Sequence, residues 1–151
     1  MKRTAGILAY RRTPAGVEVF LVHPGGPYWR NKDVHGWSMP KGEFEDGPAE
    51  VAARREFEEE TGQTLEGGLT PLPPIRASGK EIHAFVIESD APDPERVRSN
   101  TFELEWPPKS GRRQTFPEVD RAGWFSLADA RTRLHKGQLP LLDALIRHLD
   151  E

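Results

Sequence analysis

Three glutamates spaced for one face of a helix are the residues of this chain best suited to chemistry. Glu56, Glu59 and Glu60 stand at i, i+3 and i+4, so on a helix their side chains fall within one arc of roughly 100°. Glu58 points to another side. Like charges at this spacing repel, whereas Mg²⁺ binds carboxylate oxygens. The spacing predicts a divalent-metal site for phosphate chemistry, and its alternative is a solvated acidic helix face.

A glycine turn and two helix-boundary residues surround these glutamates. Lys41 and Gly42 precede them, with Lys41 placed to contact a phosphate or, alternatively, to be a solvated turn lysine. Proline is favoured in the first turn of a helix and glycine just after its end. Pro48 and Gly62 therefore predict the two ends of the helix that carries the glutamates.

The whole block resembles the Nudix box. Its second half is the segment Arg55-Glu56-Phe57-Glu58-Glu59-Glu60-Thr61-Gly62, which matches the family pattern. The first half departs from the pattern: Pro48 stands where the family has a glutamate, and the spacing from Gly42 to Arg55 is one residue shorter. Gln63 stands at the closing apolar position.

The resemblance covers nearly the whole chain. Residues 37–42 are similar to the segment before the box in diadenosine tetraphosphate hydrolases, and residues 5–8 resemble the first strand of the family. Residues 23–27, 99–108 and 116–125 are similar to a bacterial Nudix branch described as nucleoside triphosphate pyrophosphohydrolases. The resemblance implies an α/β (α+β) fold, an α/β/α sandwich around a mixed β-sheet, with residues 1–151 forming a single domain.

The resemblance also implies roles for individual residues. The expected metal ligands, for Mg²⁺ or alternatively Mn²⁺, are the side chains of three glutamates and one backbone carbonyl: Glu56, Glu59, Glu60 and Gly42. The catalytic candidates are the same glutamates with a further acidic residue: Glu56, Glu59, Glu60 and Glu118. A surface position or a partner for Arg121 is the alternative for Glu118, and which glutamate acts as the base stays open.

Cationic and aromatic residues complete the predicted site. Ammonium and guanidinium groups bind phosphates, and the candidates for substrate binding are Lys41, Lys80, Arg112 and Arg113. For the last two, in residues 109–113, a solvated loop is an equal alternative. Arg55 resembles a structural arginine that orients carboxylates. Candidates for stacking on a nucleobase are Tyr28, Trp29, Trp37 and Trp106, although packing is the commoner fate of tryptophan.

Composition limits the class of protein. The chain of 151 residues has 21 Lys and Arg against 24 Asp and Glu, a net charge of −3, so no overall basic field favours nucleic-acid wrapping or an anionic membrane. It has no cysteine, which excludes disulfides and thiolate nucleophiles and is compatible with a reducing cytoplasm. The five histidines show no metal-ligand spacing. With no signal peptide or spanning segment in the sequence, we predict a cytoplasmic protein.

Apolar patterning predicts the elements around the site. Residues 4–10 and 17–23 are expected to form a hairpin, and residues 80–88 a buried strand near the sheet centre. Further strands are expected at residues 37–39, 101–106 and 122–125, and helices at residues 48–62, 127–135 and 139–149. Loops are expected at residues 24–36, 65–74 and 91–98, the last with a short helical turn as the alternative.

These residues together predict a Mg²⁺-dependent pyrophosphohydrolase in which water attacks phosphorus. The expected substrate is a small nucleotide, a nucleoside diphosphate linked to another group, with dinucleoside polyphosphates favoured. One alternative is a pyrophosphatase of ordinary or oxidised nucleoside triphosphates. Another is a nucleotide-sensing Nudix module without turnover, which the missing glutamate at Pro48 keeps open. The bond cleaved, the number of metals and the oligomeric state stay open.

Overall fold

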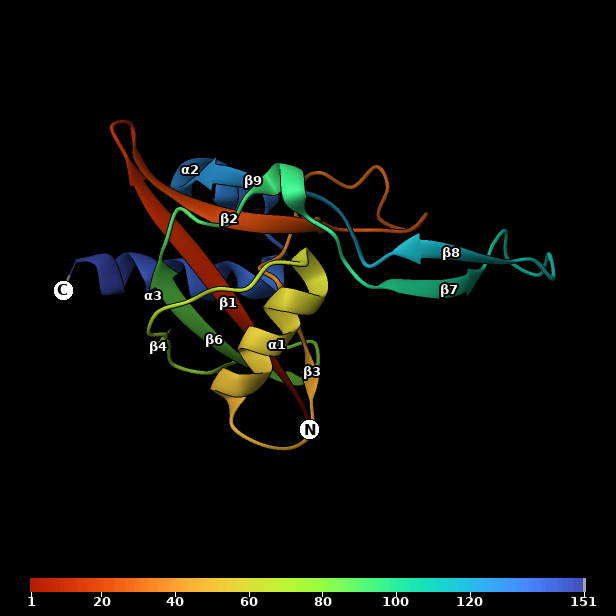
Figure 1. Cartoon of the computed structure of the whole chain (residues 1–151), viewed down its shortest axis with the longest axis horizontal. Helices are drawn as coiled ribbons and strands as arrows, with labels where there is room; N and C mark the ends of the chain where they lie inside the picture. The colour runs from red at the N-terminus through yellow and green to blue at the C-terminus, as the bar shows by residue number, and fades with distance from the viewer. Residues whose placement is uncertain (151) are drawn as a thin grey trace.

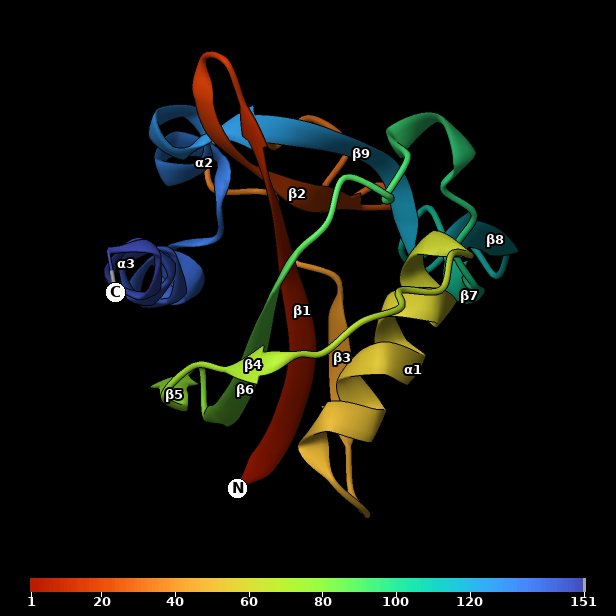
Figure 2. The same ribbon diagram turned by 60° about the vertical axis from the view of Figure 1, so that its left-hand side comes forward.

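A computed structural model describes residues 1–150 and shows a mixed sheet covered by helices on both faces (Figures 1 and 2). The seven-stranded sheet has the order β4-β6-β1-β2-β9, with β3 paired to β1 and β5 paired to β6. Helix α1 lies on one face, and α2 and α3 lie on the other (Figure 2). The predicted α/β/α sandwich is confirmed.

The elements follow one another along the chain in an order that mixes strands and helices. The strands are β1 (Lys2–Thr13), β2 (Gly16–Pro24), β3 (Lys41–Phe44), β4 (Thr70–Pro71), β5 (Ile75–Ala77), β6 (Lys80–Glu88), β7 (Thr101–Glu105), β8 (Arg113–Pro117) and β9 (Val119–Ser126). The helices are α1 (Ala49–Thr61), α2 (Leu127–Arg133) and α3 (Leu139–Leu149), with short 3₁₀ turns η1 (Pro94–Arg96) and η2 (Lys136–Gln138).

Strand β1 is the centre of the sheet. It forms the predicted hairpin with β2 and pairs in parallel with β6, which itself pairs with β4 and β5 on its other side. The predicted central position of residues 80–88 is therefore confirmed. Because side chains alternate along a strand, β1 sends Ala5 and Ile7 into the core under α1, and Leu8 and Tyr10 into the core under α3.

Each helix that covers the sheet is fixed by apolar residues. Phe57 of α1 is 1% exposed and packs against Phe20 of β2, with ring centroids 6.1 Å apart. On the other face, Leu142 and Leu145 of α3 are fully buried. Burying side chains of this size stabilises by roughly 1.5–3 kcal/mol each. The apolar face of α1 is thus fixed on the sheet, which determines where its acidic face points.

The prediction of a short strand at residues 37–39 is wrong, as is that of a turn at Gly42. Trp37 and Ser38 form only isolated bridges, whereas Lys41–Phe44 is strand β3, antiparallel to β1. Gly6 of β1 explains this close pairing, because a Cβ at that position would lie 2.6 Å from Cβ of Lys41. A long-range contact decides the location of this strand.

A second difference between the predicted and the observed elements lies in the segment between β6 and β9. Residues 109–112 lie in the connection between β7 and β8, in agreement with the loop alternative, whereas Arg113 begins β8, which pairs with β7 to form a separate two-stranded ribbon. The ribbon extends away from the main sheet (Figure 1). Two smaller differences are β4, which lies within the expected loop 65–74, and α2, which ends at Arg133 rather than at residue 135.

Within residues 1–150, no helix is both long and apolar enough to cross a membrane.

Candidate active site

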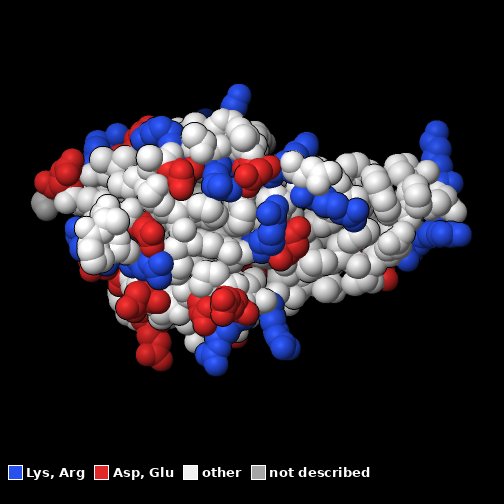
Figure 3. Space-filling view, turned by 90° about the horizontal axis from the view of Figure 1, so that it is seen from above, with Lys and Arg blue, Asp and Glu red and all other residues white. Residues whose placement is uncertain are grey.

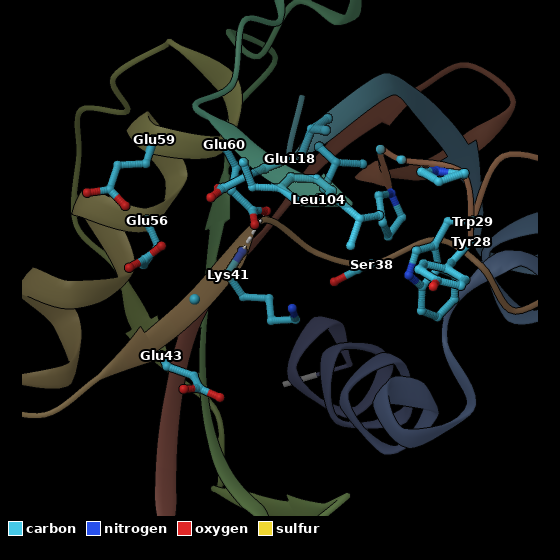
Figure 4. Close-up of a pocket in the computed structure, with 18 residues that line it drawn as sticks. Tyr28, Trp29, Ser38, Lys41, Glu43, Glu56, Glu59, Glu60, Leu104 and Glu118 are labelled. Carbon is cyan, nitrogen blue, oxygen red and sulfur yellow. Dashed lines mark hydrogen bonds between the residues drawn. The ribbon is translucent and has the colours of Figure 1, made fainter. Parts of the chain in front are cut away.

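Helix α1 presents its three spaced glutamates to one cavity. Glu56, Glu59 and Glu60 line a hollow of about 550 Å³ together with Lys41 of β3 (Figure 4). Glu58 is exposed and is not among the residues that line this cavity. The face assigned from the helical spacing is confirmed. Gly62 ends the helix in the left-handed conformation, φ 72°, and its N–H donates to the carbonyl of Glu58.

Gly42 and Glu56 fit together at the floor of the cavity. A Cβ at Gly42 would lie 2.0 Å from Oε2 of Glu56, far inside any normal contact. The Glu56 side chain is 12% exposed, and Oε1 lies 3.5 Å from the Arg55 guanidinium. Burial and the nearby Glu59 raise the pKa of Glu56 above its ordinary value. The absence of a side chain at Gly42 is therefore what lets this carboxylate lie against β3.

Glu60 is the most electrostatically perturbed member of the cluster. Its Oε1 accepts a hydrogen bond from the backbone N–H of Lys41, 3.1 Å away. Burial raises the pKa of Glu60 to about 7, with the carboxylates of Glu118 and Glu56 adding to the rise and Lys41 opposing it. A carboxyl group with a pKa near neutrality is suited to accepting and releasing a proton.

Glu118 reaches the same cavity from the segment before β9. Its N–H donates to the carbonyl of Asn100 (2.9 Å), and its carbonyl accepts from the N–H of Gly25 (3.0 Å). These bonds tie the base of the ribbon to the loop after β2. The structure thus brings Glu118 together with the α1 glutamates (Figure 4), as the prediction of a further acidic residue requires.

The far wall of the cavity is aromatic and apolar. Tyr28 and Trp29 come from the loop after β2, and Phe102 and Leu104 come from β7. A Cβ at Gly26 would lie 2.9 Å from Cζ of Phe102, so the loop and the ribbon are in direct contact. Leu104 lies beside Glu118, whereas Tyr28 and Trp29 lie at the end of the hollow away from Glu56 and Glu59 (Figure 4), so a ligand meets charged groups at one end and aromatic rings at the other.

The donor set fits a divalent cation. Carboxylate and carbonyl oxygens are the ligands that Mg²⁺ prefers, and the raised pKa values of Glu56 and Glu60 reflect burial together with repulsion between the carboxylates. Within residues 1–150, no three acidic or histidine side chains are already close enough to form a metal-ligand group. The carboxylates would therefore have to move toward one another to bind an ion together.

Comparison with known proteins identifies the family. The sequence model of the NUDIX domain matches residues 2–145. This chain belongs to the NUDIX family. The family resemblance expected from the box is thereby confirmed, and it extends from β1 into α3.

Solved structures of other Nudix proteins have the same fold. One is a Caenorhabditis elegans Ap4A hydrolase in a binary complex, with a TM-score of 0.68 and 22% identity over 99% of this chain and 98% of that one. Another is the NUDIX domain of Shewanella oneidensis NrtR complexed with ADP ribose, with a TM-score of 0.64 and 16% identity over 97% of this chain and 87% of that one.

A curated relative matches over a shorter segment. It is an RNA pyrophosphohydrolase of Caulobacter vibrioides, 44% identical over 54 residues, which are 32% of this chain and 31% of the relative. The chain therefore matches about a third of the length of this relative.

Three of the predicted substrate-binding residues lie outside the Nudix carboxylate cavity. Lys80 lies in an adjoining groove, where its Nζ is 3.0 Å from Oε1 of Glu43. Arg112 and Arg113 are exposed on the ribbon, and Arg113 lies 3.5 Å from Glu103. Lys and Arg side chains gather at the far end of this ribbon (Figure 3). Of the predicted cations, only Lys41 lines the cavity.

The predicted stacking residues are divided between the cavity wall and other positions. Trp37 is 4% exposed, and its Nε1 donates to Asp33, so it belongs to the core. Trp106 lies edge-on to Tyr28, with ring centroids 5.3 Å apart. Sequence reasoning missed Phe102 and Leu104, although their alternation with exposed residues in β7 marks one apolar face of a strand.

We expect the metal-free protein to lose stability as pH rises through the range in which Glu60 titrates. The folded pKa of Glu60, about 7, exceeds its ordinary value of 4.5. Its stabilising contribution is therefore fully present below about 4.5 and is lost as pH rises toward about 7. The loss is on the order of 2 kcal/mol in the free energy of unfolding.

Urea unfolding in EDTA, at about pH 5 and about pH 7.5, measures this loss. Glu60→Gln should remove most of the difference between the two pH values, because its amide does not titrate. An identical pH dependence in Glu60→Gln and the parent would show that Glu60 does not carry the linkage.

Proposed function

We propose that this Nudix protein is a Mg²⁺-dependent pyrophosphohydrolase that cleaves a phosphoanhydride bond in a nucleoside diphosphate linked to another group. The observation that carries the proposal is the convergence of five carboxylates, Lys41 and an aromatic wall in one cavity. In this proposal Glu56, Glu59, Glu60 and the carbonyl of Gly42 hold the metal. Water is the nucleophile.

Each residue has a distinct task in this reaction. A bound divalent cation supplies positive charge at the phosphate oxygens and lowers the pKa of water. Lys41 adds a cationic donor to a phosphate oxygen. Before a cation binds, burial holds the pKa of Glu60 at about 7, and the base that takes the proton of the attacking water is one of the cavity carboxylates. Glu118 adds a further carboxylate at the cavity rim.

Tyr28, Trp29 and Phe102 provide the surface for a nucleobase. Stacking on aromatic side chains contributes roughly 1–3 kcal/mol per base. The position of Tyr28 and Trp29, at the end of the cavity away from Glu56 and Glu59 (Figure 4), leaves the phosphates over α1. This division suits a nucleotide whose phosphate chain continues past the reacting phosphorus, and dinucleoside polyphosphates are the favoured substrates.

The 54-residue match to an RNA pyrophosphohydrolase supports a second candidate, a 5′-triphosphorylated RNA end. Ordinary or oxidised nucleoside triphosphates are a third. All three share the phosphoanhydride bond and the same reacting groups, so they differ only in what lies beyond the phosphates.

A substrate panel with Mg²⁺ and identification of the products tests the proposal. With diadenosine tetraphosphate we expect ATP and AMP, and the reaction in ¹⁸O-water shows which product carries the label and thus which phosphorus is attacked. Faster conversion of a nucleoside triphosphate to monophosphate and pyrophosphate would replace the favoured substrate and keep the reaction class. Faster removal of pyrophosphate from triphosphorylated RNA would do the same.

A Nudix module that binds nucleotides without turnover is the alternative from another class. Pro48, at the position where the box has a glutamate, favours it. The same panel decides between them, because nucleotide binding without product release from any substrate would establish the binding module.

A further inference from the structure

A second hollow adjoins the carboxylate cavity, and Glu43 lines both. It measures about 1210 Å³ and is formed by the start of β1, the end of β3, the turn between β5 and β6, and Arg55 of α1. We call it the cationic groove, defined by Lys2, Arg3, Arg55 and Lys80 around Glu43.

The groove is lined by four cationic side chains, Lys2, Arg3, Arg55 and Lys80, against three carboxylates, Glu43, Glu45 and Asp46, an excess of one positive charge. Lys2 and Lys80 are direct partners in the parallel β1–β6 pairing, and like charges at such positions repel. Both ammonium groups lie near the carboxylate of Glu43, at 4.0 Å and 3.0 Å. Because Lys2 and Lys80 share this carboxylate, a phosphate group is suited to the position beside them.

Arg55 continues the cationic surface up to the carboxylates. It lines the groove, is half exposed, and lies 3.5 Å from Glu56. Arg3 of β1 donates to the backbone carbonyl of Glu45 and lies over the ring of Phe44. The groove thus begins beside the α1 glutamates and runs away from the aromatic wall.

The carboxylate cavity and the cationic groove together form one surface with two chemically different ends. Tyr28 and Trp29 lie at one end, Lys41 lies between, and Glu56 and Glu43 lie at the other end (Figure 4). We infer that the cationic groove binds the part of a phosphate chain that extends beyond the cleaved bond, while the nucleoside lies on the aromatic wall. This inference rests on the proposed function and adds the orientation of the substrate and the class of ligand, a linear polyphosphate.

Glu43 has a particular part in this subsite. It holds Lys80 and Lys2 in place in the free protein, and it repels an incoming phosphate through its own charge. Phosphate binding exchanges the Lys80–Glu43 pair for a Lys80–phosphate pair. Removing the Glu43 charge should therefore strengthen polyphosphate binding, whereas removing the Lys80 charge should weaken it.

Binding of inorganic tripolyphosphate by calorimetry, in EDTA and at low salt, tests the groove without any turnover. Lys80→Ala should weaken binding about tenfold, because a charged hydrogen bond to phosphate is lost. Glu43→Gln should strengthen it. Lys136→Ala, an exposed lysine outside the groove, is the matched control and should bind like the parent. Equal affinities in Lys80→Ala, Glu43→Gln and Lys136→Ala would overturn the inference.

Turnover gives an independent comparison. Lys80→Ala should raise KM for diadenosine tetraphosphate about tenfold and change KM for ADP-ribose much less, because two phosphates do not extend into the groove. An equal rise for both substrates would contradict the assigned direction. If no substrate is turned over, the proposed hydrolase function fails, and the tripolyphosphate measurement still decides whether the groove binds a phosphate chain.

Discussion

Glu59→Gln and Glu60→Gln are each expected to lower Mg²⁺-dependent turnover by about two to four orders of magnitude with the fold intact. Both side chains face the cavity, and neither belongs to the apolar core that holds α1 on the sheet. An amide keeps the size of the side chain and removes the charge that a cation requires. For Glu60 it also removes the group whose pKa is raised to about 7.

Steady-state kinetics at saturating Mg²⁺, together with circular dichroism, measure this effect. Glu58→Gln is the matched control on the same helix, because Glu58 is exposed and outside the cavity. Its turnover should stay close to that of the parent. Near-normal activity in both cavity variants, or an equal collapse in folded Glu58→Gln, would refute the catalytic role proposed for this helix face.

The stability of the metal-free protein distinguishes loss of the Glu60 charge from a general folding defect. Burial raises the pKa of Glu60, so its ionised form is costly in the folded protein at neutral pH. Glu60→Gln should therefore unfold at a higher temperature than the parent in EDTA at about pH 7.5. The same variant would then be more stable and less active, which a folding defect does not produce.

The local part of the site was predictable from the sequence. Within α1, a period of 3.6 residues places Glu56, Glu59 and Glu60 on one face, and Pro48 and Gly62 mark the helix ends. Both inferences depend on residues close together in the chain. The same holds for the β1–β2 hairpin, where the turn and the two apolar runs are contiguous.

The rest of the site depends on contacts between distant segments. Lys41 begins a strand because Gly6 allows close pairing with β1, and no local pattern around Lys41 carries that information. Arg112 and Arg113 were expected near phosphate, but β8 pairs with β7 and places them on a ribbon outside the cavity. Lys80 lies in the adjoining groove because the parallel pairing of β1 and β6 sets it beside Lys2.

Gly42→Ala is expected to lower turnover about a hundredfold, because misplacing a reacting group by about 1 Å has an effect of this size. The added methyl would lie 2.0 Å from Oε2 and 2.2 Å from Cδ of Glu56. Either the Glu56 carboxylate must leave its position or β3 must move away from α1. Because Glu56 is a side chain at the cavity surface and β3 is bonded to β1, the carboxylate is the part that moves.

The turnover of Gly42→Ala should respond to Mg²⁺ differently from that of Glu56→Gln, which removes the Glu56 charge. Gly42→Ala keeps every carboxylate, so raised Mg²⁺ should restore part of its activity by drawing Glu56 back toward the ion, whereas Glu56→Gln should not respond. Gly68→Ala is the control, because a Cβ there meets no atom within 4 Å, and it should retain parental turnover. Parental activity in Gly42→Ala would show that the position of Glu56 against β3 is not needed for the reaction, and the metal-binding role proposed for Glu56 would then have to be abandoned.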